Sequence, residues 1–250
     1  MKTELLCPIM AACFVIIASC KKGISDNESA FQSVQFASDQ KIGEIDFNSV
    51  SFTNSTMLTN KFFPYQTIGR TYVFEGETPD GLERNEIQRI DVVKVVMGIN
   101  VAVIRDRVWL DGVLEEDTRD WFAQDNDGNV WYMGEDVDNY NPDGTIRDHE
   151  GAWEAGINGA VAGIIMLANP KSGISYQQEF AAGIAEDKAK VVAMGLTILV
   201  PLNTYEGCLK TKEWSDLEKG AIDFKFYAPG IGLIKEKKNN TESKLVAIVE

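Results

Sequence analysis

The sequence predicts a mainly β protein: an antiparallel meander that forms a curved sheet, a half-barrel or a barrel, with at most one or two short helices. Two observations support this class. Segments that alternate apolar and polar residues recur along the chain, and turns rich in Asp, Asn and Gly separate them. Long strands in a meander must hide or pair their edges, which favours a sheet that bends toward closure.

Four hairpin-type turns organise the first half of the predicted domain. They end at Gly81, Gly112, Gly128 and Gly144, and the last three of these glycines are spaced by 16 residues each time. Asp or Asn tolerates the turn dihedrals, and Gly supplies positive φ. One turn and one strand fill each interval, so consecutive turns lie at opposite ends of the strands, as in a meander.

Alternation supports further strands at 70–75, 188–192, 223–227 and 244–249. The apolar segment 158–168 is different, because it contains Gly159 and Gly163 at a small-xxx-small spacing. It is too short to span a membrane. We expect a buried loop or a short helix there.

The N-terminus predicts the compartment. Residues 5–18 form a run of 14 residues without charge, too short to cross ~30 Å of hydrocarbon but typical of a secretory signal. The run closes on Ile17-Ala18-Ser19-Cys20, which resembles the bacterial lipobox. We therefore expect 1–19 to be a lipoprotein signal peptide and Cys20 to carry palmitate and further acyl chains. By resemblance to lipoprotein sorting, Lys21 favours the outer membrane. The alternative is an ordinary signal peptide cut nearby, with Cys20 incidental.

The mature chain divides into two parts. Residues 20–60 are expected to be the lipidated Cys and a polar tether, because Ser, Thr, Asn, Asp and Gln make up 20 of the 40 residues from 21 to 60. An N-terminal strand around 44–52 is the alternative for the end of this segment. Residues 61–250 are expected to form a single antiparallel β domain, long enough for a full core. Cys208 is the one Cys of this domain, which excludes an intrachain disulfide.

The charge is strongly acidic and unevenly spread. The formal net charge is −14, which excludes a broad nucleic-acid footprint. From Asp106 to Glu154 there are fifteen acidic residues and three Arg, or −12. Either these charges fan out into water or a cation neutralises them.

Calcium is the candidate cation, because it prefers carboxylate oxygens. Asp125, Asp127 and Asn129 have the alternate spacing that opens a calcium loop, and Asp136 occupies the twelfth position. The pattern departs from such a loop at Gly128, which is fourth instead of sixth. The alternative is a hairpin turn flanked by solvated strand faces.

Catalytic residues are not predicted. His149 is the one His of the chain and sits between Asp148 and Glu150, and Cys208 lies in a strand-like segment. A hydrolase built on these two residues is the least favoured alternative. Trp121 and Trp131 flank one turn, so they are placed to pair across strands or to stack on a planar ligand.

Several stretches are similar to known sequences: 120–125 (Asp-Trp-Phe-Ala-Gln-Asp), 128–135 (Gly-Asn-Val-Trp-Tyr-Met-Gly-Glu), 209–214 (Leu-Lys-Thr-Lys-Glu-Trp) and 227–234 (Tyr-Ala-Pro-Gly-Ile-Gly-Leu-Ile). Together they resemble a widespread family of uncharacterised bacterial secreted proteins and lipoproteins, over roughly residues 62–235. The family has no established activity, so the resemblance implies no site. The last stretch also looks like the end of periplasmic curved-sheet domains, including lipoprotein carriers, which is an analogy of fold.

These observations predict an envelope lipoprotein held to the outer membrane by its N-terminal lipid and acting as a binding or structural module. An apolar or amphipathic ligand on the concave face of the sheet is one expectation. A calcium-stabilised envelope module is the alternative. The sequence does not identify the ligand or protein partner.

Overall fold

The computed structural model describes residues 46–250, and the predicted signal peptide, Cys20 and most of the tether lie outside this part of the chain. One short 3₁₀ helix, η1 (Phe47–Ser49), precedes the strands. The strands are β1 (Thr71–Thr78), β2 (Gly81–Val96), β3 (Ile99–Leu110), β4 (Val113–Gln124), β5 (Val130–Tyr140), β6 (Ile146–Asp148), β7 (Trp153–Glu154), β8 (Val161–Met166), β9 (Ser175–Gln177), β10 (Glu179–Phe180), β11 (Asp187–Leu199), β12 (Thr204–Ser215), β13 (Asp223–Ala228), β14 (Gly232–Lys238) and β15 (Thr241–Val249).

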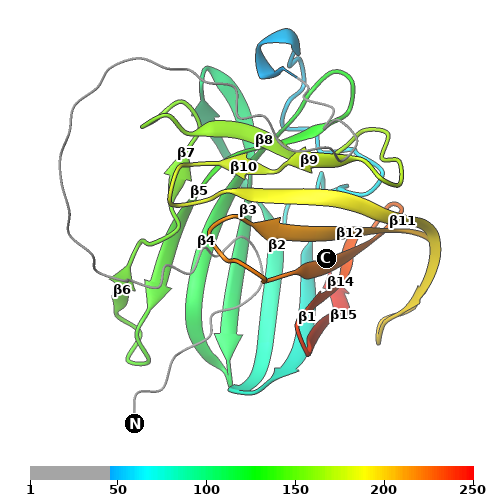
Figure 1. Ribbon diagram of the computed structural model, residues 1–250. Coiled ribbons are helices and arrows are strands. Elements are labelled where there is room, and N and C mark those ends of the chain that lie inside the picture. Colours follow the sequence, from blue (N-terminus) through cyan, green and yellow to red (C-terminus); the bar gives the residue numbers. More distant parts are fainter. Residues whose placement is uncertain (1–45) are drawn as a thin grey trace.

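All described strands belong to one antiparallel sheet, which confirms the predicted fold class. Its order is β10-β8-β5-β4-β3-β2-β1-β15-β14-β13-β12-β11-β9, with β6 and β7 added on β5. The four predicted turns join β1 to β2, β3 to β4, β4 to β5, and β5 to β6. Figure 1 shows that β8 to β12 run across the long strands β2 to β5, so the sheet folds over itself.

The segment from β9 to β10 brings the two ends of the sheet together. β9 pairs with β11 and β10 pairs with β8, although Gln178 alone separates β9 from β10 along the chain. The Gln178 amide also donates to the Asp187 carbonyl at 2.8 Å. The sheet is therefore nearly closed and barrel-like, and few edges remain unpaired.

Segment 158–168 contains strand β8 (Val161–Met166), so the predicted buried loop or short helix is wrong. The reason lies in Gly163, where an added Cβ would lie 2.4 Å from the backbone carbonyl of Gln178. A small residue lets the crossing segment approach closely. The local sequence around Gly163 indicates an apolar loop or a short helix, whereas in the fold Gly163 makes a backbone-to-backbone contact.

The packed part of the chain begins before the predicted boundary at residue 61. Leu58 is fully buried, and the Gln124 Oε1 atom accepts from the amides of Thr59 (2.8 Å) and Asn60 (2.9 Å). The Asn60 side chain donates to the carbonyls of Gly128 (2.8 Å) and Leu167 (3.1 Å). The end of the expected tether is thus an arm packed on the barrel, and its described residues 46–52 carry η1 in place of a strand.

The interior has two unlike halves. Aromatic residues fill the half beneath the arm, where Phe63 contacts both Tyr65 (4.7 Å between ring centroids) and Phe122 (4.9 Å). The inward positions of the other half carry polar and acidic side chains. Within residues 46–250 we find no helix of the length and apolar character needed to cross a membrane.

Candidate functional site

The acidic half of the interior follows from the two-residue period of the strands. In β4, Glu116, Thr118 and Asp120 point inward. Asp117 and Arg119 alternate with them on the other face, where Arg105 and Arg119 cover Asp117 and leave it 4% exposed. The same alternation on neighbouring strands places seven carboxyl groups inside, each at most 5% exposed: Glu83, Asp106, Glu116, Asp120, Glu135, Glu179 and Glu236. Four of them come from the acidic segment 106–154. The excess charge is therefore partly buried, an outcome that neither sequence alternative anticipated.

Burial changes the protonation of these carboxyl groups. It raises the pKa of Asp120 to about 6, of Glu236 to about 7 and of Glu83 to about 8. The pKa values of Asp106 and Glu135 lie well above the ordinary range, first because of burial and then because of neighbouring carboxylates. Most of this interior is therefore protonated near neutral pH, which removes the cost of burying like charges together.

One buried ion pair stands among these groups. The Lys225 Nζ atom lies 3.1 Å from Glu213 Oε2, and both side chains are 9% exposed. Thr211 donates its hydroxyl to Glu213 Oε1 at 2.7 Å. Burial works against the charge of Lys225, but Glu213 and Glu236 outweigh it, so the pKa of this lysine lies well above its usual value.

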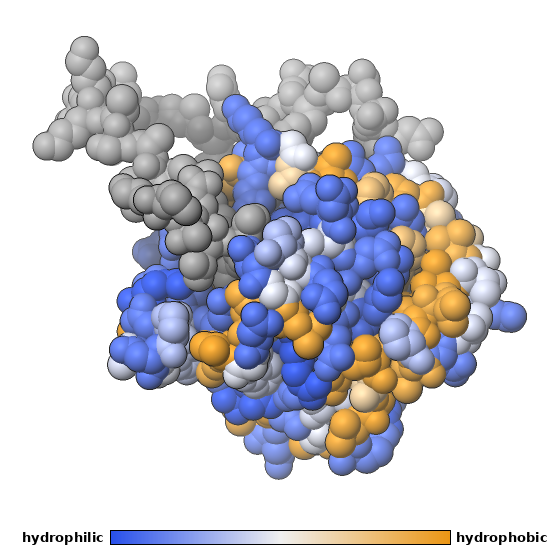
Figure 2. Space-filling view, turned by 90° about the horizontal axis from the view of Figure 1, so that it is seen from below, coloured by the Kyte–Doolittle hydropathy of each residue, from blue (hydrophilic) through white to orange (hydrophobic). Residues whose placement is uncertain are grey.

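A pocket opens into this polar interior at the end of the barrel where the β1–β2, β3–β4 and β14–β15 turns lie. It encloses about 230 Å³ and is called here the lower pocket. Its wall includes Gly76, Glu83, Glu115, Lys238 and Ser243. Figure 2 views the molecule from below, and hydrophilic residues cover much of this end, with apolar patches between them.

The wall of the lower pocket is a row of inward positions on four adjacent strands. Glu83 of β2 is the register partner of Gly76 of β1, and Ser243 of β15 is the partner of Glu236 of β14. Glu83 and Ser243 are each 4% exposed, yet Glu83 Oε1 and Ser243 Oγ have no hydrogen-bond partner. Buried polar atoms are usually paired, so such atoms in a pocket wall indicate a place where a ligand would complete the bonding.

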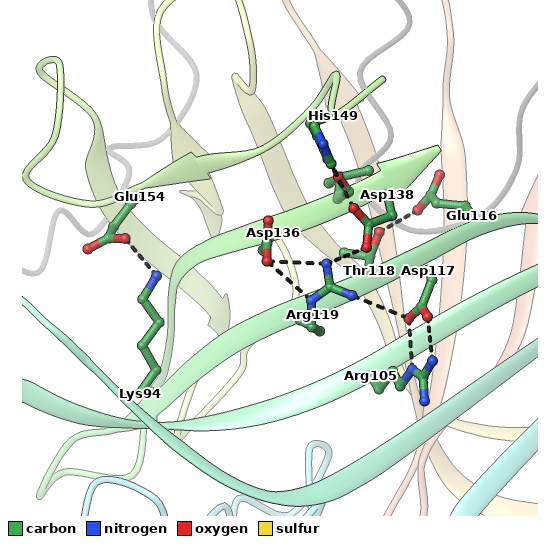
Figure 3. A network of polar contacts seen from close by, with 11 residues as sticks. Lys94, Arg105, Glu116, Asp117, Thr118, Arg119, Asp136, Asp138, His149 and Glu154 are labelled. Atoms are coloured by element: carbon green, nitrogen blue, oxygen red, sulfur yellow. Dashed lines mark hydrogen bonds and ion pairs between the residues drawn. The ribbon is translucent and has the colours of Figure 1, made fainter. Parts of the chain in front are cut away.

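The outer face of β3 to β5 carries a different arrangement, a ladder of ion pairs (Figure 3). Arg105 Nε lies 2.8 Å from Asp117 Oδ1, and Arg119 contacts both Asp136 (3.2 Å) and Asp138 (2.8 Å). Cross-strand neighbours of opposite charge stabilise a sheet modestly. The ladder pairs three carboxylates of the acidic segment, Asp117, Asp136 and Asp138, with Arg105 and Arg119.

The predicted calcium residues are held by protein contacts. Asp125 accepts hydrogen bonds from the Asn129 amide (2.8 Å) and side chain (2.9 Å) and from the Trp131 indole (2.8 Å), so it caps its turn. Asp127 lies exposed on the turn, and Asp136 belongs to the ladder. No group of three or more acidic, His or Cys residues in the described part is arranged to hold a metal ion. Calcium binding at these residues stays a prediction.

The tryptophans of this hairpin do not pair with each other. Trp121 is the register partner of Gly134, and Trp131 is the partner of Ala123. The Lys94 ammonium sits 3.1 Å above the Trp121 ring centroid and 2.7 Å from Glu154 Oε2, at a surface groove of about 490 Å³. Because this ammonium covers the ring, which is 6% exposed, Trp121 offers no open face for stacking.

His149 and Cys208 lie apart in environments that fit structural roles. His149 is exposed, with its Nδ1 atom 2.7 Å from the Val137 carbonyl and 3.0 Å from Asp138 Oδ1. Cys208 is fully buried, and burial raises the pKa of its thiol, which keeps the sulfur protonated and unreactive.

Among the described residues, the void in the aromatic half of the interior is small. The void among Phe63, Tyr65, Phe122 and their neighbours is about 20 Å³, the space of roughly one water molecule. The fold's own side chains fill this half. We therefore look for a ligand site in the polar lower pocket and not on the concave apolar face.

Sequence reasoning missed Gly76, Glu83, Glu236 and Ser243. The alternation of Glu83, Asn85 and Ile87 along one face was visible, but alternation does not say which face becomes the inside. The four residues also come from distant parts of the chain.

The fold and pocket define this chain as a nearly closed antiparallel β protein with a polar interior. No family model and no curated protein matches its sequence. Among solved structures, a candidate lipoprotein from Parabacteroides distasonis is similar, with 13% identity and a TM-score of 0.38. The match covers 79% of this chain and 100% of that one. A superposition this loose transfers neither fold nor function.

Proposed function

We propose that this protein is a binding module of the bacterial envelope, held to the outer membrane by acyl chains on Cys20, and that the lower pocket is its ligand site. The observation that carries the binding role is the pocket itself: about 230 Å³ of space beside the unpartnered oxygens of Glu83 and Ser243. The anchoring role rests on the lipobox resemblance at residues 17–20. The size of the pocket limits the ligand to a small molecule or to one group of a larger one.

Binding is tested by native mass spectrometry of the full mature chain purified from its own envelope. We expect a small adduct that is absent from Ser243→Leu, in which the added side chain fills the pocket. Ser51→Leu is the matched control, because Ser51 is exposed on the arm. An adduct that persists in Ser243→Leu, or no adduct and no ligand found by screening amines, acids and sugars, would argue against this site.

Anchoring is tested separately by labelling cells with radioactive palmitate. We expect label on the wild-type chain and none on Cys20→Ala, which should also leave the membrane fraction. A Cys20→Ala chain that stays membrane-bound would contradict the anchor while leaving the binding site untouched.

A further inference from the structure

Two oxygens in the wall of the lower pocket and one on the neighbouring strand could receive hydrogen bonds. Glu83 Oε1, Glu236 Oε2 and Ser243 Oγ are all buried and without a hydrogen-bond partner. Glu83 and Ser243 line the pocket, and Glu236 stands beside Ser243 as its register partner. The three therefore follow one row across β2, β1, β15 and β14.

Gly76 of β1 lies in the middle of this row and contributes no side chain to it. A Cβ added at Gly76 would lie 2.5 Å from the Glu242 carbonyl oxygen, so the close approach of β1 to β15 excludes any side chain here. The row thus has carboxyl groups at its two ends and small residues between them.

A primary ammonium group matches this arrangement. It carries three N–H donors and no acceptor, whereas the row offers three unpartnered oxygens. A quaternary ammonium has no N–H and leaves the oxygens unpaired. A calcium ion requires six to eight oxygen ligands, and the described residues contain no group of three acidic, His or Cys side chains placed to hold a metal.

We propose that the lower pocket binds a primary ammonium group through Glu83 and Ser243 of its wall, with Glu236, the β14 partner of Ser243, as the third acceptor. This inference rests on the proposed function and names the ligand class of the same site. The ammonium comes either from a small free amine or from the ethanolamine headgroup of a phospholipid, and both sources present the same three donors.

The charge of the pocket agrees with a cationic ligand. Besides Glu83, its lining includes the acidic residues Glu77, Asp80 and Glu115, whereas Lys238 is the one basic residue in the lining. Glu242 also borders the pocket, but its carboxylate is paired with Lys235 and Lys244 on the outer face. Lys238 lies 3.8 Å from both Glu218 and Asp223, so its charge is shared with carboxylates beyond the pocket. The surplus of carboxyl groups attracts cations into the mouth.

Binding should release a proton. Burial, with Glu236 and Glu115, raises the pKa of Glu83 to about 8, while Lys238 lowers it. Glu83 is therefore mostly protonated at pH 7 in the empty pocket. A bound ammonium stabilises the ionised carboxylate, so the proton leaves and affinity for the amine rises from pH 6 to pH 8.

The test is calorimetric titration of the full mature chain with diaminobutane at pH 8, beside tetramethylammonium and calcium chloride. We expect saturable binding of diaminobutane, at least about tenfold weaker binding of the other two, and a binding heat that varies with the ionisation enthalpy of the buffer. Glu83→Gln should weaken diaminobutane binding about tenfold or more and remove the buffer dependence, and Ser243→Ala should weaken it about threefold or more.

The matched control is Glu75→Gln, which removes one carboxylate from the opposite face of β1, where Glu75 pairs with Arg84 at 2.9 Å. It should change affinity by less than about twofold. Glu83 is largely protonated, so Gln replaces it with little risk to folding, and a thermal melt of each variant checks this point.

The source of the ammonium is tested with vesicles. The chain without acyl groups is mixed with phosphatidylethanolamine or phosphatidylcholine vesicles. Retention by the phosphatidylethanolamine vesicles alone would assign the headgroup as the source. Binding of diaminobutane without retention by either vesicle would assign a free amine. Equal binding of tetramethylammonium and diaminobutane, or no effect of Glu83→Gln, would overturn the ammonium inference. A native adduct of another class would overturn it while leaving the proposed binding function intact.

Discussion

Two neighbouring cross-strand pairs on β4 and β5 show how differently one sheet treats its charges. Asp120 faces Glu135 on the inside, and Arg119 faces Asp136 on the outside, one residue away on each strand. The outer pair is an ion pair of 3.2 Å. The inner pair places two carboxyl groups opposite each other, which would be unfavourable if both carried a charge. The inner pair persists for two reasons. Burial raises the pKa of Glu135 well above its usual value, so this carboxyl group stays protonated, and Tyr132 donates its hydroxyl to Asp120 at 2.5 Å.

This difference teaches that formal charge is a poor guide to the state of the folded protein. On the outer face the ladder pairs its acids with arginines, whereas the inner face holds most of its acids neutral. The folded protein therefore carries fewer negative charges at pH 7 than the formal −14. Where inner carboxyl groups border a pocket, they can change state when a cation arrives.

The largest expected effect is the pH dependence of the free energy of unfolding. The raised pKa values of Asp120, Glu236 and Glu83, about 6, 7 and 8, mean that the folded protein holds more protons than the unfolded chain above about pH 4. Stability should therefore fall by several kcal/mol as pH rises from 5 to 8. Urea unfolding at half-unit pH steps measures it.

On the outer face, the pH dependence of the free energy of unfolding has the opposite sign. Hydrogen bonds from Lys235 and Lys244 lower the pKa of Glu242 to about 2, so this group's contribution is present above pH 4.5 and is lost as pH falls toward 2. Maximum stability on the acid side of neutrality would support this contrast between the inner and the outer face. A maximum at pH 8 would contradict it.

Lys225→Met should cost about 3–5 kcal/mol, because it leaves the Glu213 carboxylate buried without its cation. Adding Glu213→Gln should recover part of this loss, since the remaining amide carries no charge. Denaturant unfolding of both variants gives the two values. If Lys225→Met alone were as stable as the wild type, the interior would be far more hydrated than its burial indicates.

Glu135→Gln isolates one inner carboxyl group. We expect little change in stability at pH 5 and a gain of about 1–3 kcal/mol at pH 8, because the amide needs no proton to remain neutral. The same denaturation assay at the two pH values measures this gain. An equal effect at both pH values would mean that packing, and not protonation, decides the outcome.

Asp136→Asn is the outer counterpart and the smallest expected effect. The Asp136 side chain is 54% exposed, and Arg119 keeps Asp138 as a partner, so the loss should stay below about 0.5 kcal/mol and shrink in high salt. Thermal melts at low and high salt test it. A loss above about 2 kcal/mol would mean that the ladder acts as one cooperative network.

The fold class was predictable because its causes are local. Asp-Gly turns and alternating strands specify hairpins whatever the rest of the chain does, and β1 to β5 follow each other in the sheet as a meander requires. β8 was not predictable, because Gly163 reads as a helix or loop residue until Gln178 lies against it. The calcium hypothesis rested on the acidic excess and on the spacing of four residues, and it stays untested. In the fold, Asp125 Oδ1 accepts from the chain's own amides.

The sequence by itself determined the hairpins, the strand periodicity, the acidic excess and the lipobox-like N-terminus, since each depends on residues close together along the chain. The tertiary structure alone decided which face of each strand became the inside, and with it which acids are ionised and which are protonated. It also decided that Glu83, Gly76, Ser243 and Glu236 form one row. The physical reason is that desolvation depends on what covers a side chain, and here the covering strands are distant in sequence.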